Sequence, residues 1–412
     1  MTHSVALTQP LTLPCGQVLK NRLGKSAMSE ALGTIDNKPT GALAVLYGRW
    51  AEGGIGLCIT GNVMVDSRAL GEPNNVVLQD DSELALLTEW AQAGTANGVQ
   101  LWMQLNHPGK QTPKALNLEA VGPSAVPFGP ALQKFFGTPR ALTEPEILDL
   151  VARFGRSAGL AKRAGFTGVQ IHGAHGYLVS QFLSAHHNTR EDRWGGSLEN
   201  RMRFVTEVYQ AIRAEVGPEF AVGIKLNSAD FQKGGFSEEE SMAVIRTLAG
   251  LGIDLIEISG GTYEAPAMSG TRRKESTELR EAYFLDFAEK VRAEVDVPLM
   301  VTGGFRSSEA IAAALASGAL DVVGLARPLA VDPDFPNALL SGEAVTSPIR
   351  LITTGIKFID RAGLAEVTWY ARQLHRMGAG KPPKPDESAL LALVKSFSSM
   401  GVRTFRSRRL RA

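Results

Sequence analysis

Eight short apolar segments alternate with longer segments of helical periodicity, and this alternation constrains the fold more than any other feature of the chain. Such an alternation is typical of parallel strands joined by helical crossovers. The predicted strands span residues 23–28, 56–65, 99–107, 168–175, 220–227, 254–260, 297–303 and 321–326. The predicted helices lie near residues 41–52, 81–97, 145–164, 198–216, 237–251, 283–295 and 307–317.

Two architectures fit this alternation, a doubly wound open sheet and a closed barrel. Eight strands spread over about 300 residues without a break in composition favour the barrel. The expected fold is therefore α/β, a single eight-stranded parallel (β/α)8 TIM barrel. No linker rich in Pro, Gly or Ser precedes residue 378. We predict a barrel domain over residues 1–376, followed by a linker and a basic C-terminal tail over residues 377–412.

Local signals mark the ends of the predicted helices. Thr143 with Glu146, and Ser237 with Glu240, have the spacing of capping boxes at helix N-termini. A glycine stands just before the next strand where a helix is expected to turn back into the sheet. These glycines are Gly98, Gly165, Gly217, Gly252 and Gly318.

Two segments depart from the regular repeat. Residues 108–142 form a long loop inserted after the third strand, and insertions of this kind usually serve as lids or substrate-binding loops. The pattern of residues 345–376 predicts a last helical region. The sequence MGAGKPPKPDES then interrupts the helical pattern before a basic tail that ends VRTFRSRRLRA. A basic tail can contact an anionic surface, but we interpret this one as a solvated or subunit-docking segment.

The composition argues against nucleic-acid and membrane partners. Lys and Arg total 43 against 42 Asp and Glu, a formal net charge of +1, so no overall field recruits a polyanion. Cys15 and Cys58 are too few for a disulfide framework or a four-thiolate metal site. No apolar stretch reaches the ~18 residues of a membrane span, and the N-terminus has no signal-peptide pattern. A cytoplasmic protein is expected.

Two common nucleotide-binding motifs are absent. No predicted strand is followed by G-x-G-x-x-G, which argues against a Rossmann dinucleotide site. The Gly24-Lys25-Ser26 tripeptide resembles the end of a P-loop, but Leu19 replaces the glycine required five residues earlier.

The sequence I-H-G-A-H-G-Y-L, residues 171–178, ends the fourth predicted strand. Residues at the C-terminal ends of barrel strands face the active site. The imidazoles of His172 and His175 can converge there on one carbonyl oxygen and stabilise negative charge on it, and the Tyr177 phenol can deliver a proton. A metal pair or a structural histidine remains an alternative, although no third ligand lies nearby in the sequence.

Glycines and an arginine end the last two strands. Gly303-Gly304 follows strand seven and Ala326-Arg327 follows strand eight, the usual place for a phosphate in this fold. Tight-turn glycines with a surface arginine are the alternative. Gln104 stands between apolar neighbours, and a buried amide needs partners. Lys225 at the end of strand five faces either the site or solvent.

Five separated motifs occur in the order expected of one family, and the likeness covers roughly residues 5–340. The stretch H-G-A-H-G-Y-L…Q-F-L-S…N-x-R-x-D-x-W-G-G-S-x-E-N-R resembles the long signature of the old yellow enzyme family of flavin-dependent oxidoreductases. The other four are N-R-L-G-K-S-A-M-S (21–29), Q-L-N-H-P-G (104–109), V-T-G-G-F (301–305) and G-L-A-R-P (324–328).

The resemblance implies an FMN held non-covalently at the C-terminal mouth of the barrel. NADH or NADPH would reduce it, and a hydride would then pass to the β-carbon of a small electrophilic alkene. Gln104 would bond the pyrimidine edge of the flavin, and Lys225 would sit by N1 and O2. Gly61 would give a backbone contact. The ring would be lined by Ser26, Ala27, Met28 and Ser29, and the phosphate bound at Gly303, Gly304, Ala326 and Arg327.

The chain departs from the family pattern at several positions. Ala27 replaces a common proline, and Trp194 stands where tyrosine is usual. Lys225 replaces a more frequent arginine, which keeps the charge but loses the planar fork. Ser29 stands where the family keeps Thr or Cys near the flavin C4 carbonyl. Two cysteines cannot carry the iron–sulfur cluster of the longer dienoyl-CoA reductase relatives.

Three functions are consistent with these features. The first is an FMN-dependent NAD(P)H:alkene oxidoreductase in which His172 and His175 bind carbonyl or nitro oxygens and Tyr177 donates the proton. The second is a flavin-free barrel lyase or isomerase acting on a phosphorylated substrate. The third is a non-catalytic flavin-binding protein. A homo-oligomer is expected from the family alone.

Overall fold

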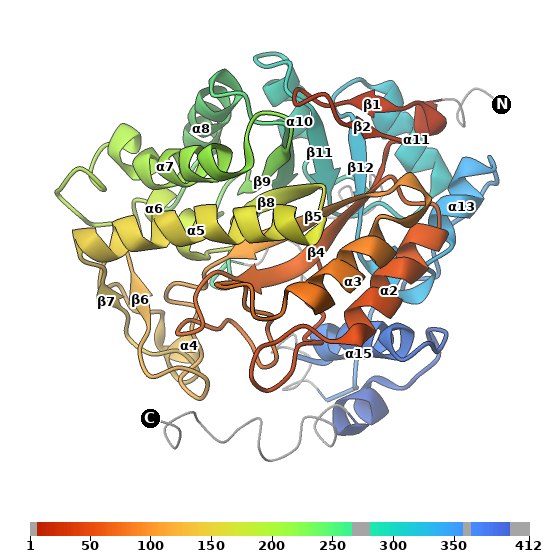
Figure 1. Ribbon diagram of the computed structural model, residues 1–412, viewed down its shortest axis with the longest axis horizontal. Helices are drawn as coiled ribbons and strands as arrows, with labels where there is room; N and C mark the ends of the chain where they lie inside the picture. Colours follow the sequence, from red (N-terminus) through yellow and green to blue (C-terminus); the bar gives the residue numbers. More distant parts are fainter. Residues whose placement is uncertain (1–5, 266–280, 357–363, 396–412) are drawn as a thin grey trace.

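The structure, a computed structural model, describes residues 6–265, 281–356 and 364–395 (Figure 1). Eight parallel strands close into a barrel in the order β10-β11-β12-β3-β4-β5-β8-β9. The predicted barrel is confirmed. Its strands are β3 (Leu23–Lys25), β4 (Leu57–Met64), β5 (Gln100–Asn106), β8 (Gly168–Gly173), β9 (Ala221–Asn227), β10 (Leu255–Ser259), β11 (Leu299–Thr302) and β12 (Val322–Leu325).

A ring of helices packs outside the barrel, as Figure 1 shows. Every predicted crossover helix is present. The largest boundary difference is in the second, because Asn97 adopts a left-handed φ of 57° and the chain leaves the helix before it. The helices are α2 (Gly41–Glu52), α3 (Leu84–Gly94), α5 (Glu144–Ala164), α7 (Leu198–Val216), α8 (Glu238–Gly250), α10 (Leu285–Arg292) and α11 (Ser308–Ala316).

The predicted helix ends are confirmed where their geometry is diagnostic. Gly165 ends α5 with a φ of 96°, a conformation that costs glycine little. Its N–H donates to the carbonyls of Ala161 and Lys162. At the start of α8, Ser237 and Glu240 form the reciprocal capping box.

One tryptophan fills the half of the barrel at the N-terminal ends of the strands, called the lower half here. The indole of Trp102 on β5 is fully buried, and a Cβ at Gly168 or Gly223 would approach it to 2.6 or 2.8 Å. Both glycines therefore make room for the ring on the neighbouring strands. The N-terminal hairpin of β1 (Leu11–Thr12) and β2 (Val18–Leu19) contributes apolar side chains to the same cluster. The lower barrel is a packed core, so ligands must bind at the other end.

The insertion after β5 and the C-terminal segment flank the barrel at the C-terminal ends of its strands. The insertion 108–142 carries β6 (Val121–Gly122), α4 (Pro130–Gln133) and β7 (Arg140–Ala141), which lie to one side of the barrel in Figure 1. Helix α15 (Leu364–Gly378) packs near α2.

The prediction of helix from residue 345 is wrong for residues 345–356, which have no helical structure. These residues instead pair with the start of α11, where Ser308 N–H donates to Val345 O at 2.9 Å and Ser347 N–H to Arg306 O at 2.7 Å. Most of the predicted basic tail, residues 396–412, lies outside the described residues. No helix in the described parts of the chain has the length and apolarity to cross a membrane.

Candidate active site

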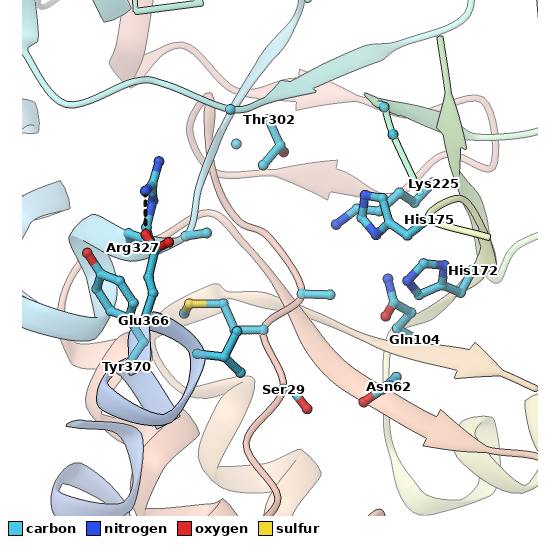
Figure 2. Close-up of a pocket in the computed structure, with 18 of the residues that line it drawn as sticks. Ser29, Asn62, Gln104, His172, His175, Lys225, Thr302, Arg327, Glu366 and Tyr370 are labelled. Carbon is cyan, nitrogen blue, oxygen red and sulfur yellow. Dashed lines mark hydrogen bonds and ion pairs between the residues drawn. The ribbon is translucent and has the colours of Figure 1, made fainter. Parts of the chain in front are cut away.

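A cavity of about 430 Å³ opens at the C-terminal mouth of the barrel (Figure 2). It brings together all the sequence-predicted site residues except Ser26 and Gly61. Helix α15 closes part of the wall, which the sequence did not predict. The predicted residues that line the cavity are Ala27, Met28, Ser29, Gln104, His172, His175, Tyr177, Lys225, Gly303, Gly304, Ala326 and Arg327.

Ser26 and Gly61 lie behind the cavity wall. The Ser26 hydroxyl bonds Thr302 Oγ1 at 2.6 Å inside the barrel. The Gly61 N–H donates to Glu30 Oε1 at 2.8 Å and to Tyr47 Oη at 3.0 Å, and its carbonyl accepts from Thr60 at 2.8 Å. The backbone of Gly61 therefore has protein partners, and its contact with a flavin stays a prediction.

A hydrogen-bonded polar layer forms the floor of the cavity above the apolar core. Gln104 on β5 donates to Gln170 on β8 at 2.8 Å. Gln170 donates to Glu257 on β10 at 2.7 Å, and Lys225 Nζ on β9 lies 3.0 Å from the same carboxylate. Thr302 also donates to Glu257, at 2.6 Å. Gln170, Glu257 and Thr302 are functional neighbours that sequence reasoning missed, although each is a polar residue inside a strand pattern.

Glu257 and Lys225 form a buried ion pair. Burial alone would raise the pKa of Glu257, but Lys225, Thr302 and Gln170 together lower it. Lys225 is only 3% exposed, which rules out the alternative of a solvated strand-end lysine. The layer thus presents a fixed positive charge to the cavity from a side chain that cannot swing away.

The other end of the cavity carries the features of a phosphate site. Gly303 and Gly304 have φ of 131° and 98°, and a Cβ on Gly304 would lie 1.4 Å from the Glu281 carbonyl. Only glycine fits there. Arg327 begins α12 (Arg327–Val331), and its guanidinium pairs with Glu366 of α15 at 2.9 Å, the dashed contact in Figure 2. Glu366 lies beyond the family motifs, so no sequence pattern predicted this pair.

The two predicted histidines face each other in the cavity as neutral rings. His172 ends β8, and its ring centroid lies 5.3 Å from that of His175. Burial lowers the pKa of His172 well below its usual value, and lowers that of His175 to about 3; Lys225 adds to both shifts. The His175 backbone is left-handed, with a φ of 60°, and Ser259 Oγ lies 2.8 Å from its Nε2. The rings can donate hydrogen bonds without carrying charge.

The predicted tyrosine stands beside this pair. The Tyr177 ring centroid lies 4.6 Å from that of His172, and its hydroxyl lies 2.9 Å from the hydroxyl of Tyr263. Burial raises the pKa of Tyr177 well above its usual value, with Tyr263 and Glu72 adding to the effect. Tyr177 is therefore a neutral phenol. Tyr263 follows β10 in the sequence G-G-T-Y, a strand-end position that sequence reasoning missed.

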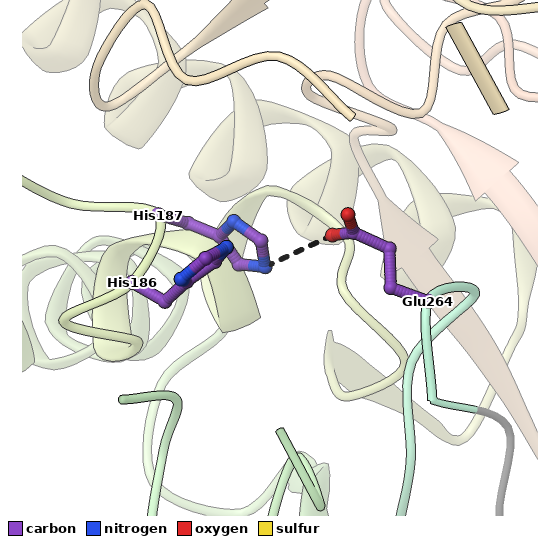
Figure 3. A group of neighbouring side chains, drawn as sticks. All are labelled: His186, His187 and Glu264. Carbon is purple, nitrogen blue, oxygen red and sulfur yellow. Dashed lines mark ion pairs between the residues drawn. The ribbon is translucent and has the colours of Figure 1, made fainter. Parts of the chain in front are cut away.

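The loop that carries Tyr263 is pinned to two neighbouring segments. Glu264 accepts from Lys110 Nζ at 3.3 Å, and its carboxylate lies 3.8 Å from His187 Nε2, as Figure 3 shows. Within the described residues, His186, His187 and Glu264 form the one group with metal-ligand spacing. Lys110 already contacts His187 at 3.1 Å as well, so a metal ion would meet an ammonium group there.

A second carboxylate lies in the cavity wall. Glu72 contacts the Ser29 hydroxyl and accepts from Asn75 Nδ2 at 3.0 Å. Burial and the nearby Glu30 raise the pKa of Glu72 to about 7. Its carboxyl is held on the Ser29 side of the cavity. Sequence reasoning missed Glu72 because it lies in an irregular loop after β4.

The donor set fits the FMN that the sequence resemblance implies. The Gly303-Gly304 turn and Arg327 suit a phosphate, while Gln104 and Lys225 suit the polar edge of a heterocycle. His172 and His175 lie on the same side of the cavity as Lys225 (Figure 2), and Tyr177, also in the cavity lining, contacts His172. One ligand can therefore have its phosphate at one end and its heterocyclic ring beside His172, His175 and Tyr177.

Comparisons with known proteins agree on one family. The model of the NADH:flavin oxidoreductase / NADH oxidase family matches residues 6–344. Over 360 residues the chain is 40% identical to an NADH-dependent flavin oxidoreductase of Hypocrea jecorina, covering 82% of this chain and 89% of that protein.

Solved structures give the same answer. The old yellow enzyme homologue of Zymomonas mobilis has a TM-score of 0.71 at 26% identity, covering 83% of this chain and 94% of that one. The 2-naphthoyl-CoA reductase has a TM-score of 0.76 at 26% identity, covering 84% of this chain and 54% of that one. The chain thus spans about half the length of that reductase.

Proposed function

Because the chain belongs to the NADH:flavin oxidoreductase / NADH oxidase family, we propose that it reduces the activated C=C bond of an α,β-unsaturated carbonyl or nitro compound. FMN is its cofactor and NAD(P)H its reductant, as the family implies. The observation that carries the alkene proposal is the convergence of two neutral histidines and a neutral phenol on one cavity.

The residues that would hold FMN divide between the two ends of the cavity. The Gly303-Gly304 turn and Arg327 would bind the phosphate, and Gln104 and Lys225 would bind the polar edge of the ring. When bound, FMN supplies the hydride chemistry, taking a hydride from NAD(P)H and delivering it to the alkene β-carbon. The positive charge of Lys225 favours the electron-rich form of a ring held beside it.

At the substrate end of the cavity, the reaction needs hydrogen-bond donors for the substrate oxygen and one general acid for the α-carbon. His172 and His175 would donate hydrogen bonds to the carbonyl or nitro oxygens, where negative charge develops as the hydride arrives. Tyr177 would then protonate the α-carbon, since its neutral hydroxyl holds the proton that the product requires. The flavin-free lyase or isomerase is set aside, because the family is one of flavin oxidoreductases.

The spectrum of the purified protein tests this proposal. We expect a yellow protein whose flavin absorbance is bleached anaerobically by NADH or NADPH and restored by a simple enone. A colourless protein that takes up no FMN would contradict the cofactor assignment. Bleaching without recovery on any enone or nitroalkene would contradict alkene reduction, and a flavin that NAD(P)H fails to bleach would indicate a non-catalytic role.

From the Arg327–Glu366 pair we predict opposite changes in FMN affinity when either partner is replaced. Arg327→Ala should weaken FMN binding by about one to two decades, because a charge-assisted contact to phosphate is lost. Glu366→Gln should tighten FMN binding by about two- to fivefold, because a partly exposed carboxylate no longer competes for the guanidinium. Dissociation constants from fluorescence titration of the apoprotein measure both. Equal affinity in the wild type and the arginine variant would place the phosphate elsewhere.

A further inference from the structure

Among the residues that the structure describes, Tyr263 is the neighbour that can exchange a proton with the Tyr177 hydroxyl along a hydrogen bond. The Tyr263 hydroxyl lies 2.9 Å from it, with the two ring centroids 6.0 Å apart. The two phenols differ in their access to solvent. Both line the cavity, but Tyr177 is 9% exposed and Tyr263 is 45% exposed, so Tyr263 is the phenol of the pair with the greater access to water.

We propose that Tyr263 is a second catalytic residue, the proton carrier through which Tyr177 recovers its proton from solvent after each turnover. This inference rests on the proposed function, since it assigns Tyr177 as the donor to the substrate. It gives Tyr263 a role that neither the fold nor the hydride chemistry requires.

The proton balance needs only the two phenols and water. The Tyr177 O–H bond breaks as the C–H bond at the α-carbon forms. The Tyr263 O–H bond then breaks as a new O–H bond forms on Tyr177, and solvent water or a buffer acid returns a proton to Tyr263. The sum is one solvent proton added to the substrate, with each tyrosine restored.

A buried donor has particular need of such a carrier. Burial raises the pKa of Tyr177 well above its usual value, so a phenolate at that position is unfavourable and must be reprotonated promptly. His172 touches the Tyr177 ring, but its lowered pKa leaves it without a spare proton near neutral pH. The Glu72 carboxyl is engaged by Ser29 and Asn75 instead.

Contacts on both sides of the Tyr263 loop hold the Tyr263 hydroxyl within hydrogen-bonding distance of the Tyr177 hydroxyl. Gly261 O accepts from Asn227 Nδ2 at 3.1 Å, and Thr262 bridges to His175. On the far side of Tyr263, Glu264 is fixed by Lys110 and His187 (Figure 3). Anchors on both sides of the tyrosine distinguish this loop from a surface turn whose side chain contacts Tyr177 by chance.

The test is a comparison of the first turnover with later turnovers in Tyr263→Phe. Reduced enzyme mixed with excess enone and NAD(P)H should complete its first alkene reduction within about threefold of the wild-type rate, because Tyr177 begins protonated. Later turnovers should slow by about tenfold or more, giving a burst of one product per site. Small buffer acids such as imidazole should accelerate the slow phase. Tyr263→His should remove the burst, with a rate that titrates near the ~6.5 of an ordinary imidazole.

Tyr209→Phe is the matched control, because its hydroxyl bonds the Leu251 carbonyl outside the cavity; it should show no burst. Equal slowing of first and later turnovers in Tyr263→Phe, without buffer acceleration, would reduce Tyr263 to a positioning role and overturn the proposal. An unchanged Tyr263→Phe, or a burst in Glu72→Gln instead, would also overturn it. If Tyr177→Phe itself leaves alkene reduction unimpaired, Tyr177 is not the proton donor, and the assignment of Tyr263 as its proton carrier is then wrong as well.

Discussion

Tyr177→Phe should slow the alkene-consuming half-reaction by roughly 10²–10⁴-fold, the usual span for a positioned general acid. The NAD(P)H-consuming half-reaction should be nearly unchanged, because it takes no proton from Tyr177. The substitution keeps the ring, which packs edge-on against His172, and removes only the hydroxyl. Anaerobic stopped-flow measurement of each half-reaction, followed by flavin absorbance, checks the expected asymmetry.

The choice of substrate sharpens this result. A nitroalkene yields a stable anion that can leave before it is protonated, so its reduction should suffer less than that of a simple enone. Equal slowing of both half-reactions would indicate that Tyr177 anchors its loop, since it precedes the short helix α6 (Leu178–Leu183). Unimpaired enone reduction would eliminate Tyr177 as the donor.

The positions of the strand-end residues followed from the sequence because they depend on local patterns. The helix-ending glycines mark where strands begin and the apolar pattern shows where they end, and the barrel rule brings all the C-terminal ends to one mouth. His172, Lys225 and Gly303 come from three different strands, yet all line the same cavity. Knowledge of the strand boundaries was enough to group them.

Contacts between distant loops could not be predicted in this way. Tyr263 meets Tyr177 across 86 residues, and Glu366 meets Arg327 from a helix outside the matched family region. No periodicity encodes such pairs, because irregular loops have no repeating geometry. The expected helix over 345–356 failed for a related reason: backbone pairing of that segment with the start of α11 outweighs its helical pattern.

The backbone role expected of Gly61 shows a limit of carrying residues over from a family. Gly61 lies within β4, before the end of the strand, and the Glu30 carboxylate lies beside its N–H. The Glu30 carboxylate and the Tyr47 hydroxyl take the Gly61 N–H. A strand pattern predicts where such a residue lies but does not encode which side chains of other segments reach its backbone, and the flavin contact of Gly61 stays a prediction.

The double variant His172→Ala/His175→Ala should lose alkene reduction by roughly 10³–10⁵-fold while FMN remains bound. Each donor aimed at developing negative charge contributes about 10²–10³-fold, and the two share one acceptor, so their effects should combine less than multiplicatively. NAD(P)H should still bleach the flavin. Inhibitory phenols, which would bind the same donors, should also bind the double variant more weakly than the wild type.

The asparagine pair His172→Asn/His175→Asn is the matched control, because an amide N–H can donate to the same oxygen. It should recover part of the lost activity, and a structural role for the rings would not predict that recovery. Phenol affinity unchanged in the alanine variant would remove both histidines from the substrate site. Loss of wild-type activity on treatment with chelators would point instead to a metal held by the pair.

The pH dependence of stability gives an independent check on the charge state of the pair. Burial lowers the pKa of both rings, that of His175 to about 3, so in the folded protein they stay neutral while in the unfolded chain they take up protons below about 6.5. Folding stability from this source is therefore present above pH 6.5 and is lost as the pH falls toward the folded-state pKa. Between pH 8 and pH 5 the Tm of the wild type should fall more steeply than that of the alanine double variant. Parallel Tm curves would mean that the histidines are solvated and titrate normally, and would contradict their assignment as neutral donors.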